Sequence, residues 1–379
     1  MKVLAAPAGF SISDEFGSDS LVCYKLIEAL ASEYDITFYA ITNSYIAVKP
    51  LPNKVKVIEE ETSINDELLA RVIFRLKCLR RALKILKNEK VDLIHQIHGT
   101  PINPLTFHKL SQNYPFIIGP IFYDPPHNYE QTKLVNKIVT KSLSMLMNIL
   151  MSKTLENCDA IVAATKTAKK YYSKFVSGKK ITVIPEGVDC KEFYYTPPPN
   201  NYDILALGIH AKHEGFEYLI RAMNAVIREY PQARLHILGD GPERLNLERL
   251  VRKLELKGKV IFHGFVPRKQ VHEFYRECYL VCSPALIKSS GLVYREAMAS
   301  GRPVVATDTI GSRETIVHGK TGFIVPIADS STLAEAIMKL LSDYELACKM
   351  GAEGRKVAEE IYDWRIIARQ YYQVYKSIL

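Results

Sequence analysis

Short apolar runs alternate with amphipathic segments along both halves of this 379-residue chain, and this alternation constrains the fold more than any other feature. In the first half the runs are KVLAAP, DITFYAI, DLIHQI, PFIIGP, DAIVAA and ITVIP, and in the second half DILALG, RLHILG, KVIFHG, YLVCSP, PVVAT and GFIVP. Apolar strands separated by helices are typical of parallel sheets covered on both faces. The sequence therefore predicts an α/β protein with two doubly wound, Rossmann-like domains.

The two series of strands are separated by TPPPNN at residues 196–201, where proline and asparagine interrupt both helices and strands. We therefore expect one domain over residues 1–196 and a second over residues 202–362. Residues 363–379 have the pattern of an amphipathic helix whose apolar side packs on a core. Two doubly wound domains would leave a cleft at the carboxyl ends of their strands, where ligands bind in such folds.

Composition argues against several other classes of protein. The seven cysteines are scattered and include no CxxC pair, so we expect reduced thiols of the cytosol rather than a zinc site. The apolar N-terminal run is interrupted at Pro7, which fits a buried strand better than a signal peptide. No run reaches the ~20 apolar residues that a membrane-spanning helix needs. We therefore expect a cytoplasmic protein.

The net charge of +9 is concentrated in two predicted helical regions. Residues 71–90 contain eight Lys or Arg, and within 131–155 Lys133, Lys137 and Lys141 fall on one i,i+4 row beside apolar residues. One interpretation is peripheral binding to an anionic membrane surface, where each basic residue contributes ~1 kcal/mol. The other is a solvated face on a helix whose apolar side packs on the sheet. No nucleic-acid-binding motif accompanies the charge, so we expect no nucleic-acid partner.

Residues 283–325 contain the strongest candidate for a functional site. A short strand ends at Pro284, a polar loop follows, and a helix that begins near Gly291 carries Glu296. The unpaired amides of a helix N-terminus, together with the helix dipole, favour an anion such as a phosphate. A carboxylate one turn further on can accept hydrogen bonds from a ribose diol. The pattern therefore predicts a nucleotide-sugar enzyme.

Three segments of the second half are distinctive: GLVYREAMASGRPVVATDTIGSRETIVHGKTGFIVP, HILGDGPE and FHGFVP. In these segments, and over nearly its whole length, the chain resembles the retaining GT-B glycosyltransferases of family 4. The resemblance implies a GT-B fold, with two domains facing a cleft and the last helix crossing back to the first domain. It implies transfer of a sugar, with retention, from a nucleoside-diphosphate sugar to a glycan or lipid-linked acceptor. The resemblance favours UDP over GDP as the nucleotide of the donor. The chain has no D-x-D motif, so we expect neither a metal ion nor another cofactor.

The resemblance also implies roles for individual residues. Glu296 would hold the ribose and the amides of residues 291–293 the diphosphate, while Phe265 and Val266 would clamp the base. His98 lies near the position of the family's active-site histidine, displaced by one residue, and Tyr123 and Asp124 are candidates for acceptor contacts. The expected catalytic residues are His98, Lys288 and Glu296. The expected nucleotide-sugar-binding residues are Gly17, Ser18, Gly208, Lys212, Gly239, Gly241, Phe265, Val266, Ser290, Gly291, Leu292, Val293 and Glu296.

Three positions depart from the family pattern. The family usually has Arg and Lys, five apart, where they neutralise the donor diphosphate, but this chain has Ile209 and Glu214. The family also has two glutamates eight residues apart. Glu296 matches the second, but this chain has Lys288 at the position of the first, which is expected to touch the donor sugar.

One interpretation is a charge exchange, in which Lys288 faces the phosphates or pairs with Glu214 and the site still works. Lys212, His210 and His213 are further cations or near-cations of this loop. The alternatives are a non-catalytic nucleotide-sugar-binding or partner subunit with a decayed site, and a membrane-surface scaffold.

Overall fold

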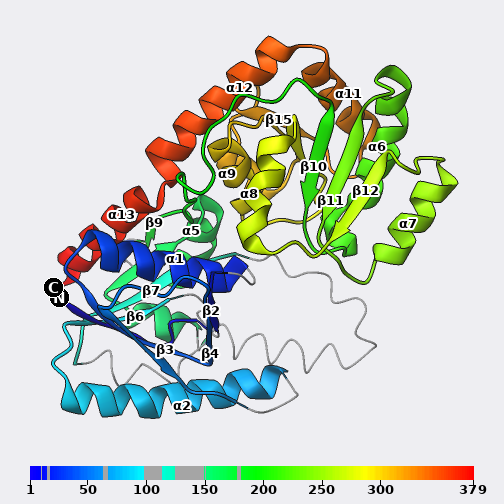
Figure 1. The fold of residues 1–379 in the computed structure, drawn as a ribbon. Coiled ribbons are helices and arrows are strands. Elements are labelled where there is room, and N and C mark those ends of the chain that lie inside the picture. Colours follow the sequence, from blue (N-terminus) through cyan, green and yellow to red (C-terminus); the bar gives the residue numbers. More distant parts are fainter. Residues whose placement is uncertain are drawn as a thin grey trace. The chain divides into compact units, whose positions relative to one another are not determined.

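The computed structural model describes residues 1–9, 11–14, 18–62, 67–97, 113–123, 149, 151–176 and 181–379. These residues form two compact units (Figure 1). The first unit consists of Met1–Glu186 together with Trp364–Leu379, and the second of Gly187–Asp363. Each unit is built around its own parallel sheet.

The chain passes into the second unit at Gly187, before the proline-rich segment at 196–201 that the sequence indicated as the boundary. The reason is that the residues between these points pack into the second unit. Val188 donates a backbone hydrogen bond of 2.8 Å to Tyr362, and Phe193 is fully buried in the same core cluster. An extended segment held by packing, without regular secondary structure, gives no local signal in the sequence.

In the described part of the first unit, seven parallel strands form a sheet in the order β5-β3-β1-β6-β7-β8-β9. These strands are β1 (Lys2–Ala5), β3 (Thr37–Thr42), β5 (Val55–Glu59), β6 (Leu93–Gln96), β7 (Phe116–Ile121), β8 (Ala160–Ala163) and β9 (Ile181–Val183). A separate pair consists of β2 (Ser11–Ser13) and β4 (Ser44–Ile46). The order reverses direction between β1 and β6.

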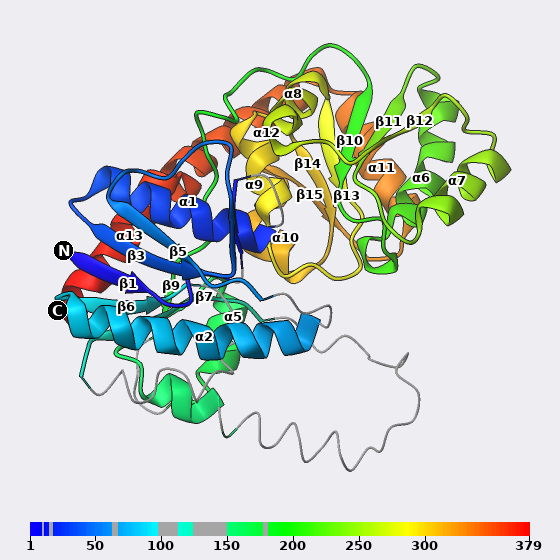
Figure 2. The same cartoon turned by 60° about the horizontal axis from the view of Figure 1, so that its bottom comes forward.

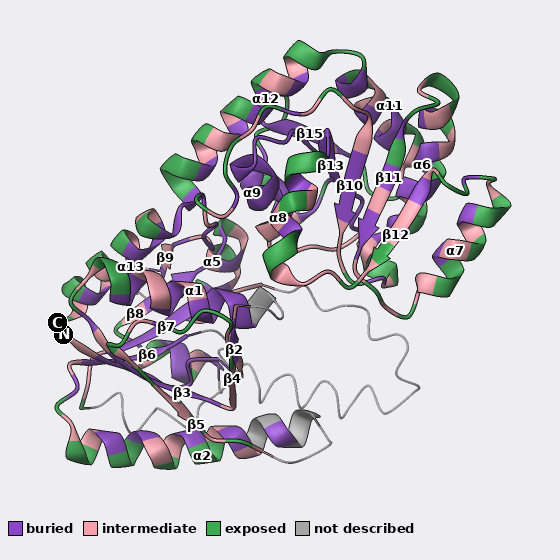
Figure 3. Ribbon diagram, viewed as in Figure 1, coloured by how far each residue is buried: buried purple, intermediate pink, exposed green. Residues whose placement is uncertain are grey.

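Helices cover both faces of this sheet (Figure 2). The helices α1 (Ser18–Glu33) and α13 (Trp364–Ile378) share one core with it, while α2 (Glu67–Asn88) and α5 (Lys166–Tyr172) share another. Successive strand residues contribute to opposite cores, so that Val3 packs with α1 and Leu4 with α2. This is why the inner strands are largely apolar, and Figure 3 shows them buried while the outer faces of the helices are exposed. The edge strand β5 has no buried residue.

The second unit has six parallel strands in the order β12-β11-β10-β13-β14-β15. They are β10 (Asp203–Leu207), β11 (Arg234–Leu238), β12 (Val260–Gly264), β13 (Leu280–Ser283), β14 (Val304–Thr307) and β15 (Gly322–Val325). One core contains residues of α6 (Phe216–Glu229), α7 (Arg244–Lys253), α11 (Ser330–Leu341) and α12 (Tyr344–Val357). Another contains residues of α8 (Arg268–Glu277) and α9 (Leu292–Ala299). The strand order reverses between β10 and β13, which is where doubly wound sheets bind ligands.

The last helix, α13, completes the first unit. Its residues Trp364, Ile367 and Tyr371 are buried in the core shared with α1. The Tyr375 hydroxyl lies 2.6 Å from His95 Nδ1 on β6, and His95 Nε2 lies 2.8 Å from the Gly119 carbonyl oxygen. Burial lowers the pKa of His95 to about 4, so the imidazole is neutral. His95 is therefore a hydrogen-bonded core residue.

The α/β architecture with two doubly wound sheets, predicted from the alternation of strands and helices, is confirmed. No helix within the described ranges is both long and apolar enough to cross a bilayer.

Candidate active site

The loops that follow β10 and β13 lie side by side because these two strands are paired. The loop after β10 contains the short helical turn η1 (Lys212–Glu214), and the loop after β13 leads into α9. Leu286 donates a backbone hydrogen bond of 2.8 Å to His213, which joins the two loops directly. Two of the three positions that depart from the family pattern, Glu214 and Lys288, therefore meet at the switch point of the sheet.

Lys288 and Glu214 form an ion pair. Lys288 Nζ lies 2.9 Å from Glu214 Oε1 and 2.8 Å from Oε2, and the two side chains are only 14% and 13% exposed. In contrast, the third departing side chain, Ile209, is 63% exposed. The carboxylate that replaces a family cation is thus neutralised by the lysine that replaces a family carboxylate.

The N-terminus of α9 has no side-chain cap. Its N-cap residue, Gly291, has no side chain that could cap the helix, and the first turn contains no acidic residue. A Cβ atom on Gly291 would lie 2.2 Å from Thr315 Oγ1, so only glycine fits at this close approach. The amides of Gly291, Leu292 and Val293 are therefore suited to hold an anion.

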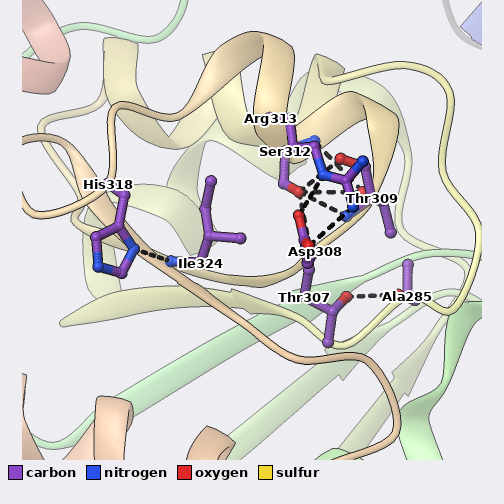
Figure 4. A network of polar contacts seen from close by, with 8 residues as sticks. All are labelled: Ala285, Thr307, Asp308, Thr309, Ser312, Arg313, His318 and Ile324. Carbon is purple, nitrogen blue, oxygen red and sulfur yellow. Dashed lines mark hydrogen bonds and ion pairs between the residues drawn. The ribbon is translucent and has the colours of Figure 1, made fainter.

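The loop that carries Lys288 rests on α10 (Ile310–Thr315), and Figure 4 shows the polar network that fixes this helix. The Thr309 side chain caps the helix by accepting from the Ser312 amide, and Ser312 Oγ donates 2.6 Å to the Thr307 carbonyl oxygen. From α10, the Gly311 amide donates 2.8 Å to the Lys288 carbonyl oxygen. The network thereby positions the backbone of residue 288.

Glu296 is almost fully buried on α9, with 2% of its side chain exposed. The Tyr275 hydroxyl donates 2.9 Å to its Oε2, and Arg268 Nη1 lies 2.6 Å from its Oε1. Burial alone would lower the pKa of Arg268, but the carboxylates of Glu296 and Glu192 outweigh burial and raise it. The sequence did not single out Arg268 as a site residue, because its only local signal is its place directly after FHGFVP.

Three neighbouring loops are joined through glycines at the carboxyl ends of β10, β11 and β12. The Gly208 amide donates 3.1 Å to Leu238, and the Gly239 amide donates 2.8 Å to Gly264. Gly239 has φ +112°, and a Cβ there would lie 2.0 Å from the Gly208 carbonyl oxygen. These contacts bring Gly208, Gly239 and the predicted base-binding residue Phe265, which is 63% exposed, to the same edge of the sheet.

The basic residues of the loop after β10 differ in character. His210 is fully buried between Phe216 and Phe262, with ring centroids 5.4 and 5.8 Å away, and burial lowers its pKa. It is therefore neutral near pH 7 and adds no positive charge to this loop. Lys212, in contrast, is exposed, and its side chain forms no ion pair with any residue that the structure describes.

The other predicted site residues lie partly within the described residues and partly outside them. Gly241 follows Gly239 in the same turn, Val266 is half-buried, and Ser290 directly precedes Gly291. In the first unit, Ser18 begins α1, and Tyr123 packs on Tyr171 with ring centroids 4.4 Å apart. Three predicted residues lie outside the described ones: Gly17, His98 and Asp124. Among the described residues, no three His, Cys, Asp or Glu side chains are grouped so that they could hold a metal ion.

Comparison with known proteins identifies the family. The family model named Glycosyltransferase Family 4 matches residues 20–192, and the model named Glycosyl transferases group 1 matches residues 192–357. The N-acetyl-alpha-D-glucosaminyl L-malate synthase of Bacillus anthracis is 32% identical over 389 residues, which cover 98% of this chain and 97% of that enzyme. The chain belongs to glycosyltransferase family 4. This glycosyltransferase therefore transfers a sugar from a nucleotide sugar, and the family and enzyme class predicted from the motifs are confirmed.

Two further proteins bear on the fold and the ligands of the glycosyltransferase. The GDP-mannose-dependent alpha-(1-6)-phosphatidylinositol monomannoside mannosyltransferase of Mycolicibacterium smegmatis is 29% identical over 217 residues, or 52% of this chain and 57% of that enzyme. The structure of Anabaena HepE in complex with UDP matches with a TM-score of 0.74 at 19% identity, and the match covers 100% of both chains. This structural likeness confirms the GT-B fold.

Proposed function

We propose that this glycosyltransferase takes its sugar from a UDP-sugar and transfers it with retention, without a metal ion, to a glycan or lipid-linked acceptor. The main support for the proposal is that each of the two carboxylates near the switch point of the second sheet, Glu214 and Glu296, is paired with a cation. Glu214 is neutralised by Lys288 and Glu296 by Arg268, so neither is left to repel a diphosphate. UDP in the HepE structure supports the choice of base, and the GDP-mannose-dependent relative makes GDP the alternative.

In the proposed donor complex, the amides of residues 291–293 hold the diphosphate, and Glu296 accepts hydrogen bonds from the ribose. The exposed cation Lys212, in the loop after β10, adds positive charge on the side where the family has Arg. In retaining enzymes of this kind, the departing phosphate takes the acceptor's proton, so the site needs no strong protein base. Positioning of the two substrates and neutralisation of the leaving group then supply most of the catalysis.

Isothermal titration with UDP, GDP and ADP, each with and without magnesium, tests the donor. Micromolar binding of UDP that magnesium does not change supports the proposal, and preferential binding of GDP would replace UDP as the donor base. A screen of UDP-sugars then tests turnover, with L-malate included among the acceptors because one relative is named for that product. Binding without turnover on any acceptor would favour the non-catalytic alternative, and no binding of any nucleotide would refute the proposal.

We further propose that the acceptor lies at an anionic membrane surface on the cytoplasmic side, contacted by α2. This helix exposes Leu76 and Leu83 at 59% and 50%, and both lie on the face that carries Arg80, Lys84 and Lys87. Within the described part of the chain, these three cations form no ion pair. Two exposed leucines among three cations give this face the mixed apolar and basic character of a membrane-surface helix. Residues 131–148, which contain the second basic row, lie outside the described residues.

Flotation with liposomes tests this surface. The wild type should float with vesicles that contain anionic lipid and remain unbound with neutral ones. Replacing Leu76 and Leu83 by Ser should reduce flotation several-fold while leaving UDP binding unchanged. Equal flotation of this variant and the wild type would exclude α2 as the contact.

A further inference from the structure

The buried carboxylate of Glu296 has one oxygen that is satisfied and one that is not. Tyr275 donates to Oε2 at 2.9 Å. Oε1 lies 2.6 Å from Arg268 Nη1, yet it accepts no well-aligned hydrogen bond from any residue that the structure describes. Arg268 therefore neutralises the charge of Glu296 through this close contact, and Oε1 keeps a lone pair that can accept from a further donor. A buried acceptor without a hydrogen bond is costly unless a ligand completes it.

The guanidinium of Arg268 presents the complementary group. Its Nε is buried and makes no hydrogen bond within the described residues, and Glu192 Oε1 lies 3.9 Å away from it. Phe193 holds the group in place, because the guanidinium carbon lies 4.9 Å from the centre of its ring. An acceptor with a spare lone pair and a donor without a hydrogen bond thus belong to two side chains in direct contact.

A vicinal diol matches this arrangement, since each hydroxyl both donates and accepts. We propose that Arg268 is the second residue of the ribose site: the 3′-hydroxyl of the donor ribose donates to Glu296 Oε1, and the guanidinium of Arg268 donates to the 2′-hydroxyl. Arg268 begins α8, two residues after Val266, the second of the predicted base-binding residues. The same arginine therefore lies in sequence next to the base site and in space next to the ribose carboxylate. This inference rests on the proposed nucleotide donor.

Discrimination between UDP and 2′-deoxy-UDP measures the diol site separately from the rest of the donor site. The wild type should bind UDP about tenfold or more tightly than 2′-deoxy-UDP, the size of one hydrogen bond to a charged group. Arg268→Gln should weaken UDP binding about tenfold and reduce the preference for ribose below about threefold. Arg268→Lys keeps the charge without the planar donor set and should fall between the two.

Arg276→Gln is the matched control, because Arg276 lies at the other end of α8 and contacts the Tyr194 hydroxyl. It should leave both nucleotide affinities unchanged, and thermal unfolding of all variants checks that they are folded. If Arg268→Gln does not fold, Arg268→Lys carries the test.

Unchanged UDP binding in the Arg268 variants, or equal losses for UDP and 2′-deoxy-UDP, would overturn the inference. A wild type that binds UDP without preferring ribose would overturn it while leaving the proposed function standing. A wild type that binds no nucleotide would overturn both.

Discussion

Reversing the charges of Lys288 and Glu214, singly and together, has an outcome that the structure predicts quantitatively. Lys288 Nζ lies 2.9 and 2.8 Å from the two oxygens of Glu214, and the side chains are 14% and 13% exposed. At an effective dielectric constant of ~20, opposite unit charges at this distance attract by roughly 6 kcal/mol. Desolvation offsets part of this attraction. We therefore expect the loss of one partner to cost about 2–4 kcal/mol, slightly less than for a fully buried pair.

Lys288→Glu places two carboxylates against each other where the diphosphate is proposed to bind. We expect the midpoint of thermal unfolding to fall by roughly 4–16 °C, because about 1 kcal/mol corresponds to 2–4 °C in a domain of this size. UDP binding should become undetectable. The double variant with Glu214→Lys restores opposite charges and gives both positions the residues that family members usually carry. It should recover most of the stability and part of the UDP binding.

Differential scanning fluorimetry and isothermal titration with UDP measure both effects. The neutral variants Lys288→Met and Glu214→Gln, with their combination, complete a double-mutant cycle for the pair. A coupling energy close to zero would mean that the ion pair does not stabilise the two loops. If both Lys288→Glu and the double variant bind UDP like the wild type, the charge exchange is refuted.

Three other predictions concern stability and donor binding. His95 has a pKa of about 4 in the fold against 6.5 unfolded, so its contribution is present above pH 6.5 and is lost as the pH falls toward 4. The wild type should therefore lose about 2 kcal/mol more stability than His95→Gln between pH 7 and pH 5, measured by urea unfolding. Arg302→Met should cost at least ~3 kcal/mol in the same assay, because the buried guanidinium donates to the carbonyl oxygens of Tyr275 (2.7 Å), Thr196 (2.9 Å) and Arg276 (3.0 Å). Gly291→Ala should weaken UDP binding more than about tenfold by titration calorimetry, and adding Thr315→Ala should restore part of it because the clashing hydroxyl is removed.

Each of these predictions has an outcome that contradicts it. Parallel pH profiles for the wild type and His95→Gln would mean that the buried imidazole does not titrate as proposed. An Arg302→Met variant as stable as the wild type would mean that water replaces the guanidinium. If Gly291→Ala binds UDP normally, the amides of residues 291–293 do not hold the diphosphate.

Much of the fold could be predicted because its signals are local. The apolar strands required two sheets covered on both faces, and successive strand residues do pack into opposite cores. In the site, the motif around Gly291 and Glu296 located a helix N-terminus, which the structure has as α9. From the sequence, Lys288 could either face the phosphates or pair with Glu214, because both positions reverse the charge of the family pattern. The structure shows the pair.

What the sequence by itself determined is therefore the succession of strands and helices, the family, and the positions where the donor site departs from it. Only the tertiary structure decided which of these charges meet. Arg268 and Glu296 are 28 positions apart, and no periodic pattern connects them; they touch because α8 and α9 pack in the same core of the second sheet. His210 is neutral for a similar reason, since Phe216 and Phe262 from other elements enclose it. Burial and ion pairing depend on neighbours brought together by folding, and the local pattern of residues does not contain that information.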